Sequence, residues 1–124
     1  DDIKLVTGFM VHCADLCAPS MDFEIAYYWS QRINQEFTNQ VKEEMTLGLP
    51  VTGYMVGLDN PIGMAKNEIS FIKFVIKPLW ECMAVLSHGA TNFIVENVNT
   101  NLQNWEDVLK KAEEEKAKAV TDQQ

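Results

Sequence analysis

The 124-residue sequence has few of the residues on which several classes of protein depend. Its three cysteines, Cys13, Cys17 and Cys82, are an odd number without a C-x-x-C pair, which argues against a disulfide framework and favours free thiols in a reducing, intracellular compartment. It contains two histidines, His12 and His88, so a complete His-rich binuclear metal site cannot be assembled from this chain.

Basic residues and long apolar runs are also scarce. Ten Lys and Arg stand against 18 Asp and Glu, and the formal net charge of −8 disfavours binding to nucleic acid or to an anionic membrane surface. The longest nearly apolar run, residues 71–86, is broken by Lys73, Lys77, Pro78 and Glu81, which makes it too short and too charged to span a membrane. We therefore expect neither a nucleic-acid partner nor a membrane span.

Hydrophobic residues are abundant, and they recur with the period of a helix. They make up 47% of the chain and repeat every three to four residues, which is typical of amphipathic helices. We expect four helices, over about residues 3–16, 20–45, 65–83 and 93–112. Ser20 is the expected N-cap of the second helix, and Pro78 should kink the third. The fold class predicted is an all-α helical bundle.

Two segments depart from this pattern. Residues 47–64 contain four glycines and two prolines, which predicts a long irregular loop. Residues 113–124 carry charge without large apolar anchors, and we expect them to form a charged, frayed tail after a domain of residues 1–112. The first residues lack both an initiator Met and a signal-like start, so the chain is expected to be a cut piece of a longer protein.

The strongest candidate for chemistry is the string from His12 to Asp15. His and Asp three residues apart share one face of a helix and can both meet a metal ion. The alternative is structural, because side chains near a helix end often make caps or local hydrogen bonds. Spacing alone leaves both interpretations open.

A wider set of residues resembles the C-terminal part of the catalytic domain of class I cyclic nucleotide phosphodiesterases. The similarity covers about residues 3–109, and most of the spacings match. The residues that carry it are Met10-Val11-His12-Cys13-Ala14-Asp15-Leu16 with Pro19, then Trp29, Arg32-Ile33, Glu36-Phe37, Phe71-Ile72, Val75 and Pro78-Leu79-Trp80-Glu81.

The resemblance implies an all-helical, HD-type fold, of which this chain is the C-terminal subdomain. Such domains hydrolyse cAMP or cGMP to 5′-monophosphates with two divalent metals, usually zinc and magnesium, and Asp15 corresponds to a late carboxylate ligand of the zinc-type site. The other ligands and the acid that protonates the leaving group precede the matching segment. We therefore expect an incomplete metal site, no catalytic residue in this chain and no activity from it alone, while His12 is structural.

The resemblance also implies a base pocket. Phe71 and Ile33 correspond to residues that stack on opposite faces of the purine, although core packing is the alternative for Phe71. Glu68 stands where the family has a Gln that pairs with the purine edge. An ionised Glu offers acceptors only, so it repels one adenine ring nitrogen but can accept from two N–H groups of a rotated guanine. Ala18 replaces an Asn found in some relatives.

Three functions follow as alternatives. The first is a fragment of a phosphodiesterase whose ligand is a cyclic nucleotide. The second is a non-catalytic interaction module on the same fold, and the third is a plain structural bundle. Core packing is the expected role of Trp29, Phe37 and Trp80. Apolar surface on the first and third helices is expected to drive association between copies of the chain.

Overall fold

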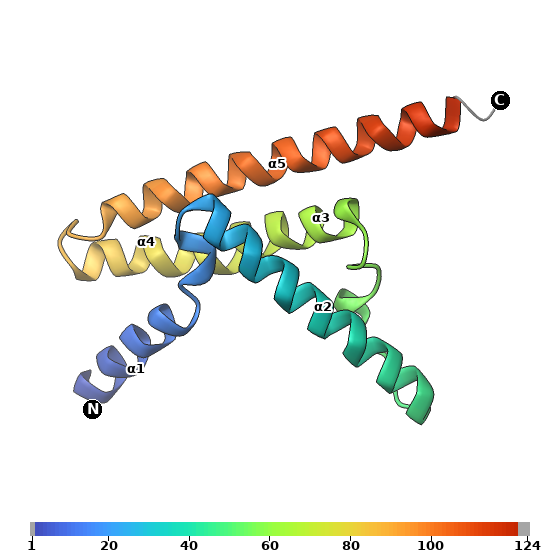
Figure 1. The fold of residues 1–124 in the computed structure, drawn as a ribbon. Coiled ribbons are helices and arrows are strands. Elements are labelled where there is room, and N and C mark those ends of the chain that lie inside the picture. The colour runs from blue at the N-terminus through green and yellow to red at the C-terminus, as the bar shows by residue number, and fades with distance from the viewer. Residues whose placement is uncertain (1, 122–124) are drawn as a thin grey trace.

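The computed structural model describes residues 2–121, and every regular element in that range is helical, as the sequence predicts. Figure 1 shows the arrangement in chain order. The elements are α1 (Asp2–Asp15), η1 (Ala18–Ser20), α2 (Phe23–Leu47), η2 (Gly53–Met55), α3 (Pro61–Phe71), the π-helical η3 (Ile72–Ile76), α4 (Lys77–Leu86) and α5 (Asn92–Thr121).

The helices form one closely packed pair and two diverging arms. α5 runs alongside the continuous path of α3, η3 and α4 and contacts all three (Figure 1). α1 and α2 diverge from this pair, and α2 moves away from α5 toward its C-terminal end (Figure 1). α3 therefore packs extensively against α5 and makes fewer contacts with α2.

The core lies between α5 and the α3–α4 path. Ile72, Ile76, Val98 and Trp105 are all almost completely inaccessible to solvent. Ile72 and Ile76 are four residues apart and therefore face the same way, while Val98 and Trp105 are seven apart on α5. This spacing produces a continuous apolar contact between the two helical paths.

The first turns of α2 are attached to α5. The ring of Tyr27 stacks on Trp105 with centroids 5.2 Å apart, and Phe23 meets the same indole edge-on at 5.4 Å. The Asn101 amide donates hydrogen bonds to the main-chain oxygens of Pro19 (2.8 Å) and Met21 (2.7 Å). These contacts fix the start of α2, whereas its far end has no comparable attachment to α5 (Figure 1).

The start of α2 corrects one expectation. Ser20 does not cap the helix; its hydroxyl donates to the Cys17 main-chain oxygen at 2.6 Å within η1, and Asp22 occupies the cap position. At the other end Gly48 adopts φ +67°, which a glycine tolerates best. The Leu49 amide then donates to the Glu44 oxygen and closes the helix two residues later than expected.

The predicted loop 47–64 is shorter than expected, because α3 begins at Pro61. Proline suits the first position of a helix, and the Asn60 side chain accepts a hydrogen bond from the Gly63 amide at 3.0 Å. A side chain at Gly63 would collide with the main-chain oxygen of Gly57, so the turn requires a glycine there. Pro61 and Gly63 therefore belong to the helix start.

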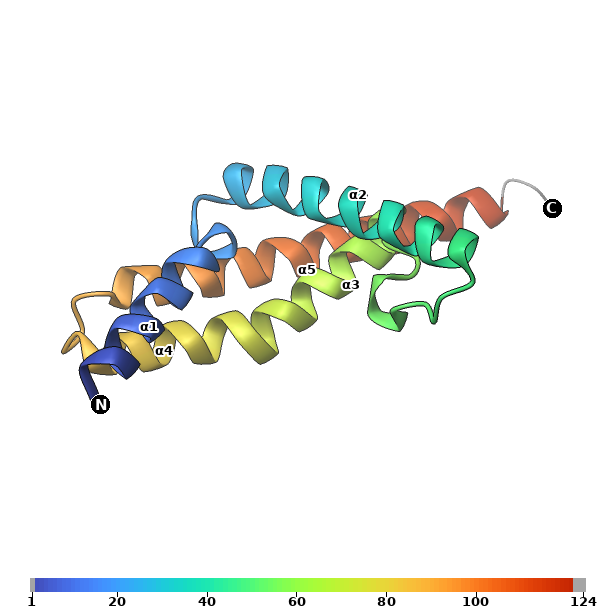
Figure 2. The ribbon, with the colours of Figure 1, turned by 90° about the horizontal axis from the view of Figure 1, so that it is seen from below.

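The irregularity predicted at Pro78 lies just before it. Proline cannot donate a backbone hydrogen bond, and its ring disfavours the regular α-helical turn before it. The chain forms the π-helical segment η3 there, in which the Lys77 amide donates to the Ile72 oxygen. The path bends between α3 and α4, as Figure 2 shows.

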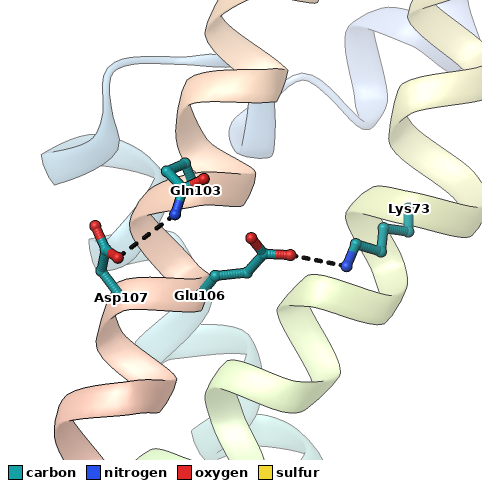
Figure 3. A network of polar contacts seen from close by, with 4 residues as sticks. All are labelled: Lys73, Gln103, Glu106 and Asp107. Atoms are coloured by element: carbon teal, nitrogen blue, oxygen red, sulfur yellow. Dashed lines mark hydrogen bonds and ion pairs between the residues drawn. The ribbon is translucent and has the colours of Figure 1, made fainter.

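Two exposed ion pairs connect this path to α5. Lys73 Nζ lies 2.8 Å from Glu106 Oε1, next to the Gln103–Asp107 pair on α5 (Figure 3). Lys66 Nζ lies 3.2 Å from Glu113 Oε1 further along. Exposed pairs of this kind contribute about 1 kcal/mol or less each, so burial accounts for most of the packing.

The charged segment after residue 112 is helical as far as Thr121, and residues 122–124 of the expected tail lie outside the described range. Ala, Glu and Lys dominate this segment and have high helix propensity, which explains the continuation. Large apolar side chains are exposed on α1 and on η3–α4, including Ile3, Leu5, Phe74 and Val85. Among residues 2–121 no helix is both long and apolar enough to cross a membrane.

Candidate functional site

A cavity of about 450 Å³ lies between α2, η1 and α3. The end of α1 and the short η2 complete its wall. All four residues that the sequence singled out, Asp15, Ile33, Glu68 and Phe71, line it, although they come from three helices separated by long stretches of chain. Concave, mostly apolar cavities with a few polar groups are typical of small-molecule sites.

The register of α2 gives the cavity its apolar wall. Ala26, Trp29, Ile33 and Phe37 recur every three to four residues and all line the cavity. Trp29 is 49% and Ile33 41% exposed, so neither is packed in a core. The expectation that Trp29 packs in the core is therefore wrong, because its side chain lines the cavity between α2 and α3 instead.

The other two aromatic residues expected in the core behave differently from each other. Trp80 is buried in the cluster under α5, as predicted. Phe37 is half-buried, lines the cavity and meets the ring of Tyr54 edge-on at 6.0 Å. The 47–64 segment thus contributes to the site through η2.

Phe71 is the last residue of α3 and has two environments. One side of it packs against the core cluster, and it also lines the cavity. The alternatives of core packing and ligand contact that the sequence left open are therefore combined in one side chain. A ring held on one side by the core loses little conformational freedom when a flat ligand binds to its other side.

Glu68 is 7% exposed and lies one turn before Phe71 on the cavity side of α3. The Ser30 hydroxyl donates a hydrogen bond of 2.8 Å to Glu68 Oε1. Burial raises the pKa of the Glu68 carboxyl above its ordinary value, and the Ser30 hydroxyl bound to it and the nearby Asn34 amide partly oppose the rise. The cavity therefore contains a desolvated acid with a fixed partner.

Asp15 is the exposed final residue of α1, at the rim of the cavity. A carboxylate there lies at the negative end of the helix dipole, where a cation would be favourable. However, no group of three His, Cys, Asp or Glu side chains capable of holding a metal occurs among residues 2–121. The residues present supply one carboxylate and do not by themselves fit a metal centre.

Two buried polar residues of the site escaped the sequence analysis. Ser30 lines the cavity, and Asn34 stands behind it, four residues further along α2. Both interrupt the apolar face formed by Ala26, Ile33 and Phe37, and that interruption is the signal that could have identified them. Ala18 also lines the cavity and adds no polar side chain to it.

Comparisons with known proteins identify the family of this chain. The family described as 3′5′-cyclic nucleotide phosphodiesterase matches residues 1–98. A dual 3′,5′-cyclic-AMP and -GMP phosphodiesterase beta of Plasmodium falciparum is 28% identical over 124 residues, which are 98% of this chain and 10% of that protein. A probable 3′,5′-cyclic-AMP phosphodiesterase of Caenorhabditis elegans is 30% identical over 122 residues, which are 98% of this chain and 18% of that protein.

A solved structure gives the same result in three dimensions. The crystal structure of the phosphodiesterase domain of the Salpingoeca rosetta rhodopsin phosphodiesterase superposes with a TM-score of 0.86 at 32% identity, over 96% of this chain and 36% of that one. The chain therefore spans about a third of that domain and has its helical fold. Because the family match covers most of the sequence, the chain belongs to the 3′,5′-cyclic nucleotide phosphodiesterase family.

Proposed function

We propose that this chain forms the nucleobase-binding wall of a domain that hydrolyses cAMP or cGMP to the 5′-monophosphate. The observation that carries the proposal is the convergence of Asp15, Ile33, Glu68 and Phe71 on one cavity. An apolar cavity of about 450 Å³ with an acid at its inner wall suits a flat heteroaromatic ring with a polar edge.

The two apolar residues would hold the base by its faces. Phe71 offers an aromatic ring fixed by the core, and Ile33 offers an exposed aliphatic side chain from α2. Stacking of a base on an aromatic side chain contributes about 1–3 kcal/mol and depends little on which base is bound. Glu68 lies one turn from Phe71, where it would meet the edge of the base.

Asp15 would act at the opposite end of the ligand, as one ligand of a metal centre. Zinc and magnesium are the cofactors expected from the family, and they would neutralise charge on the phosphoryl group. The described residues provide a single carboxylate for this centre. The remaining ligands would come from parts of the domain outside these 124 residues.

The base-binding part of the proposal is tested with Phe71→Leu in the full-length protein. Leucine preserves most of the packing against the core but removes the aromatic face, so cyclic nucleotide binding should weaken by about 5- to 100-fold. Phe74→Leu is the matched control, because Phe74 is 80% exposed and does not line the cavity. Isothermal titration with hydrolysis-resistant phosphorothioate analogues of cAMP and cGMP gives the two affinities.

Two results would count against the proposal. Equal binding by the two leucine variants would remove Phe71 from the site. Normal nucleotide binding by the wild type without hydrolysis, in the presence of zinc and magnesium, would favour a non-catalytic module on the same fold.

The 124-residue chain alone is expected to lack hydrolytic activity and to self-associate. One carboxylate cannot hold two metals, and the exposed apolar side chains on α1 and η3–α4 favour contacts between copies. A metal-dependent turnover of about 1 s⁻¹ or more would contradict the first expectation. A monomer in sedimentation experiments over a wide concentration range would contradict the second.

A further inference from the structure

A chain of buried polar groups leads from α2 to the cavity. The Asn34 Nδ2 donates to the Ser30 main-chain oxygen at 2.8 Å and to Ser30 Oγ at 3.0 Å. The Ser30 hydroxyl in turn donates to Glu68 Oε1 at 2.8 Å. All three residues are at most 7% exposed. The Asn34–Ser30–Glu68 relay is therefore shielded from water along its length.

The direction of the relay follows from its chemistry. A main-chain carbonyl only accepts, so the Asn34 amide must turn its nitrogen toward Ser30. Because Ser30 Oγ accepts one proton from that nitrogen, its own proton is directed at Glu68 Oε1. The relay thus donates toward Glu68, and Oε1 is committed as an acceptor.

The burial of the Asn34 side chain is energetically unfavourable, so one of its contacts must account for it. Its Oδ1 is buried and has no hydrogen-bond partner in the described part of the chain. Such atoms are rare in folded proteins because desolvation is not compensated, and an apolar side chain would avoid the loss. Both hydrogen bonds of the amide are with Ser30, and the same side chain also lowers the pKa of the Glu68 carboxyl. Both effects point to the setting of Ser30 and Glu68 as the role of Asn34.

The second carboxyl oxygen of Glu68 is left for a ligand. Oε2 makes no hydrogen bond with any residue from 2 to 121, and the side chain borders the cavity. When the carboxyl is ionised, Oε2 only accepts; when it is protonated, Oε2 carries the proton and donates. A glutamine held by Ser30 through its oxygen would present a donor in both conditions, so Glu68 adds a state that glutamine lacks.

We propose that Ser30 and Asn34 are specificity-determining positioning residues, which reserve Glu68 Oε2 for the base and make base preference depend on pH. The inference rests on the proposed function, in which the ligand is a cyclic purine nucleotide. Ionised Oε2 favours guanine, whose ring N–H and amine are adjacent donors. Protonated Oε2 favours adenine, whose ring nitrogen accepts next to its amine.

Few other titratable side chains lie near Glu68 in the described part of the cavity, so the pH dependence is assigned to Glu68. Besides Glu68 itself, the titratable side chains among the described cavity residues are Asp15 at the rim and Tyr54 from η2. α2 and η1 contribute no charged side chain to the cavity wall in this range. Lys42 and Asp59 line a separate small pocket behind Asn34. Burial moves the pKa of Glu68 upward, which brings its titration closer to neutral pH.

The test is equilibrium binding of hydrolysis-resistant phosphorothioate analogues of cAMP and cGMP to the full-length protein between pH 5 and 9. The ratio of cGMP to cAMP affinity should rise by about five-fold or more as the pH increases. Ser30→Ala removes a hydrogen bond that lowers the pKa of Glu68, so the rise should move to higher pH. Asn34→Leu should move it in the same direction by a smaller amount, while Ser30→Thr keeps the hydroxyl and the wild-type profile.

Glu68→Gln is the reference without titration, and its affinity ratio should not change with pH. A flat ratio in the wild type, with both analogues bound, would overturn this inference and leave the proposed function intact. A Ser30→Ala profile equal to that of the wild type would overturn the positioning role. Failure of one analogue to bind at every pH would overturn this inference alone, and failure of both would overturn the proposed function as well.

Discussion

The two sides of α3 differ in composition and in what covers them. One side contributes Met64 and Ala65 to the cluster under α5, which continues through Ile72 to the fully buried Trp105. The other side presents Glu68 to the cavity, opposite the exposed Trp29 and Ile33 of α2. The first side is closed by a helix that runs along it, and the second is left open by a helix that diverges.

The comparison shows where the surface of the candidate site originates. Leaving Trp29 and Ile33 exposed forgoes roughly 25 cal/mol of stabilisation for each Å² of apolar surface that packing could have buried. The attachment of α2 to Trp105 and Asn101 at its start keeps the helix in place despite this loss. The core side thus supports the cavity side, and the two should respond differently to the same substitution.

The largest difference in the free energy of unfolding is expected between alanine substitutions of two tryptophans, Trp105 and Trp29. Trp105→Ala should lower the free energy of unfolding by about 3–5 kcal/mol, because it removes a fully buried indole and the partner of Phe23 and Tyr27. Trp29→Ala should cost about 1 kcal/mol or less, because that indole is half exposed. Urea denaturation followed by circular dichroism measures both. Equal losses would mean that the cavity side is packed as tightly as the core.

A second substitution, at Asp15 on the rim of the cavity, should change activity without changing stability. In the full-length protein, Asp15→Asn should lower kcat/KM at limiting metal by about 100-fold or more, because the proposed metal ligand would lose its charge. The free energy of unfolding should hardly change, because Asp15 is exposed and makes no hydrogen bond from its side chain in the described range. Glu24→Gln, an equal change of charge outside the cavity, is the control. Full activity of Asp15→Asn at limiting metal would show that Asp15 is not a ligand.

The smallest effect concerns the buried acid. The pKa of Glu68 is raised by desolvation, so the folded state binds its proton more tightly than the unfolded state. The stability associated with that proton is present at acid pH and is lost as the pH rises through the raised pKa. Glu68→Gln should therefore unfold like the wild type near pH 4 and be more stable by about 1 kcal/mol at higher pH.

Glu44, on the exposed end of α2, is a control because its pKa is shifted in the opposite direction to that of Glu68. Hydrogen bonds from Gln40 and from Thr52 lower the pKa of its carboxyl, so it stabilises the fold at neutral pH and loses that effect as the pH falls. Glu44→Gln should therefore be less stable than the wild type at neutral pH and equal to it in acid. Guanidinium unfolding at several pH values reports both variants, and parallel pH profiles for the two would contradict the assignment of Glu68 as a desolvated acid.

Helix content could be predicted from the sequence because it depends on local periodicity, whereas several boundaries could not. In the sequence, Pro61 and Gly63 indicate the end of regular structure. They nevertheless form the start of α3, because Asn60 caps the helix and the main chain of Gly57 lies close to Gly63. The charged segment after residue 112 reads as a tail but continues as helix, since its Ala, Glu and Lys residues favour that conformation and Glu113 meets Lys66.

The resemblance predicted the residues of the candidate site and a shared pocket for Ile33, Glu68 and Phe71, but not the polar residues that contact them. Asp15, Ile33, Glu68 and Phe71 were identified by resemblance, and the structure places them around one cavity. Trp29 was assigned to the core because an indole at helical spacing usually packs there. Its exposure depends on the angle between α2 and α3, which no local pattern contains.

The sequence by itself determined the helices, the acidic charge and the presence of a carboxylate at position 68, because these depend on residue type and on spacing within a few turns. The tertiary structure decided which side of α3 is covered by α5 and which oxygen of Glu68 accepts the Ser30 hydroxyl. Contacts between residues far apart in the chain set both outcomes: Trp105 and Asn101 hold the start of α2, and Ser30 reaches Glu68 across 38 positions of sequence. Such contacts form only when the helices pack, so the periodic pattern of the sequence does not predict them.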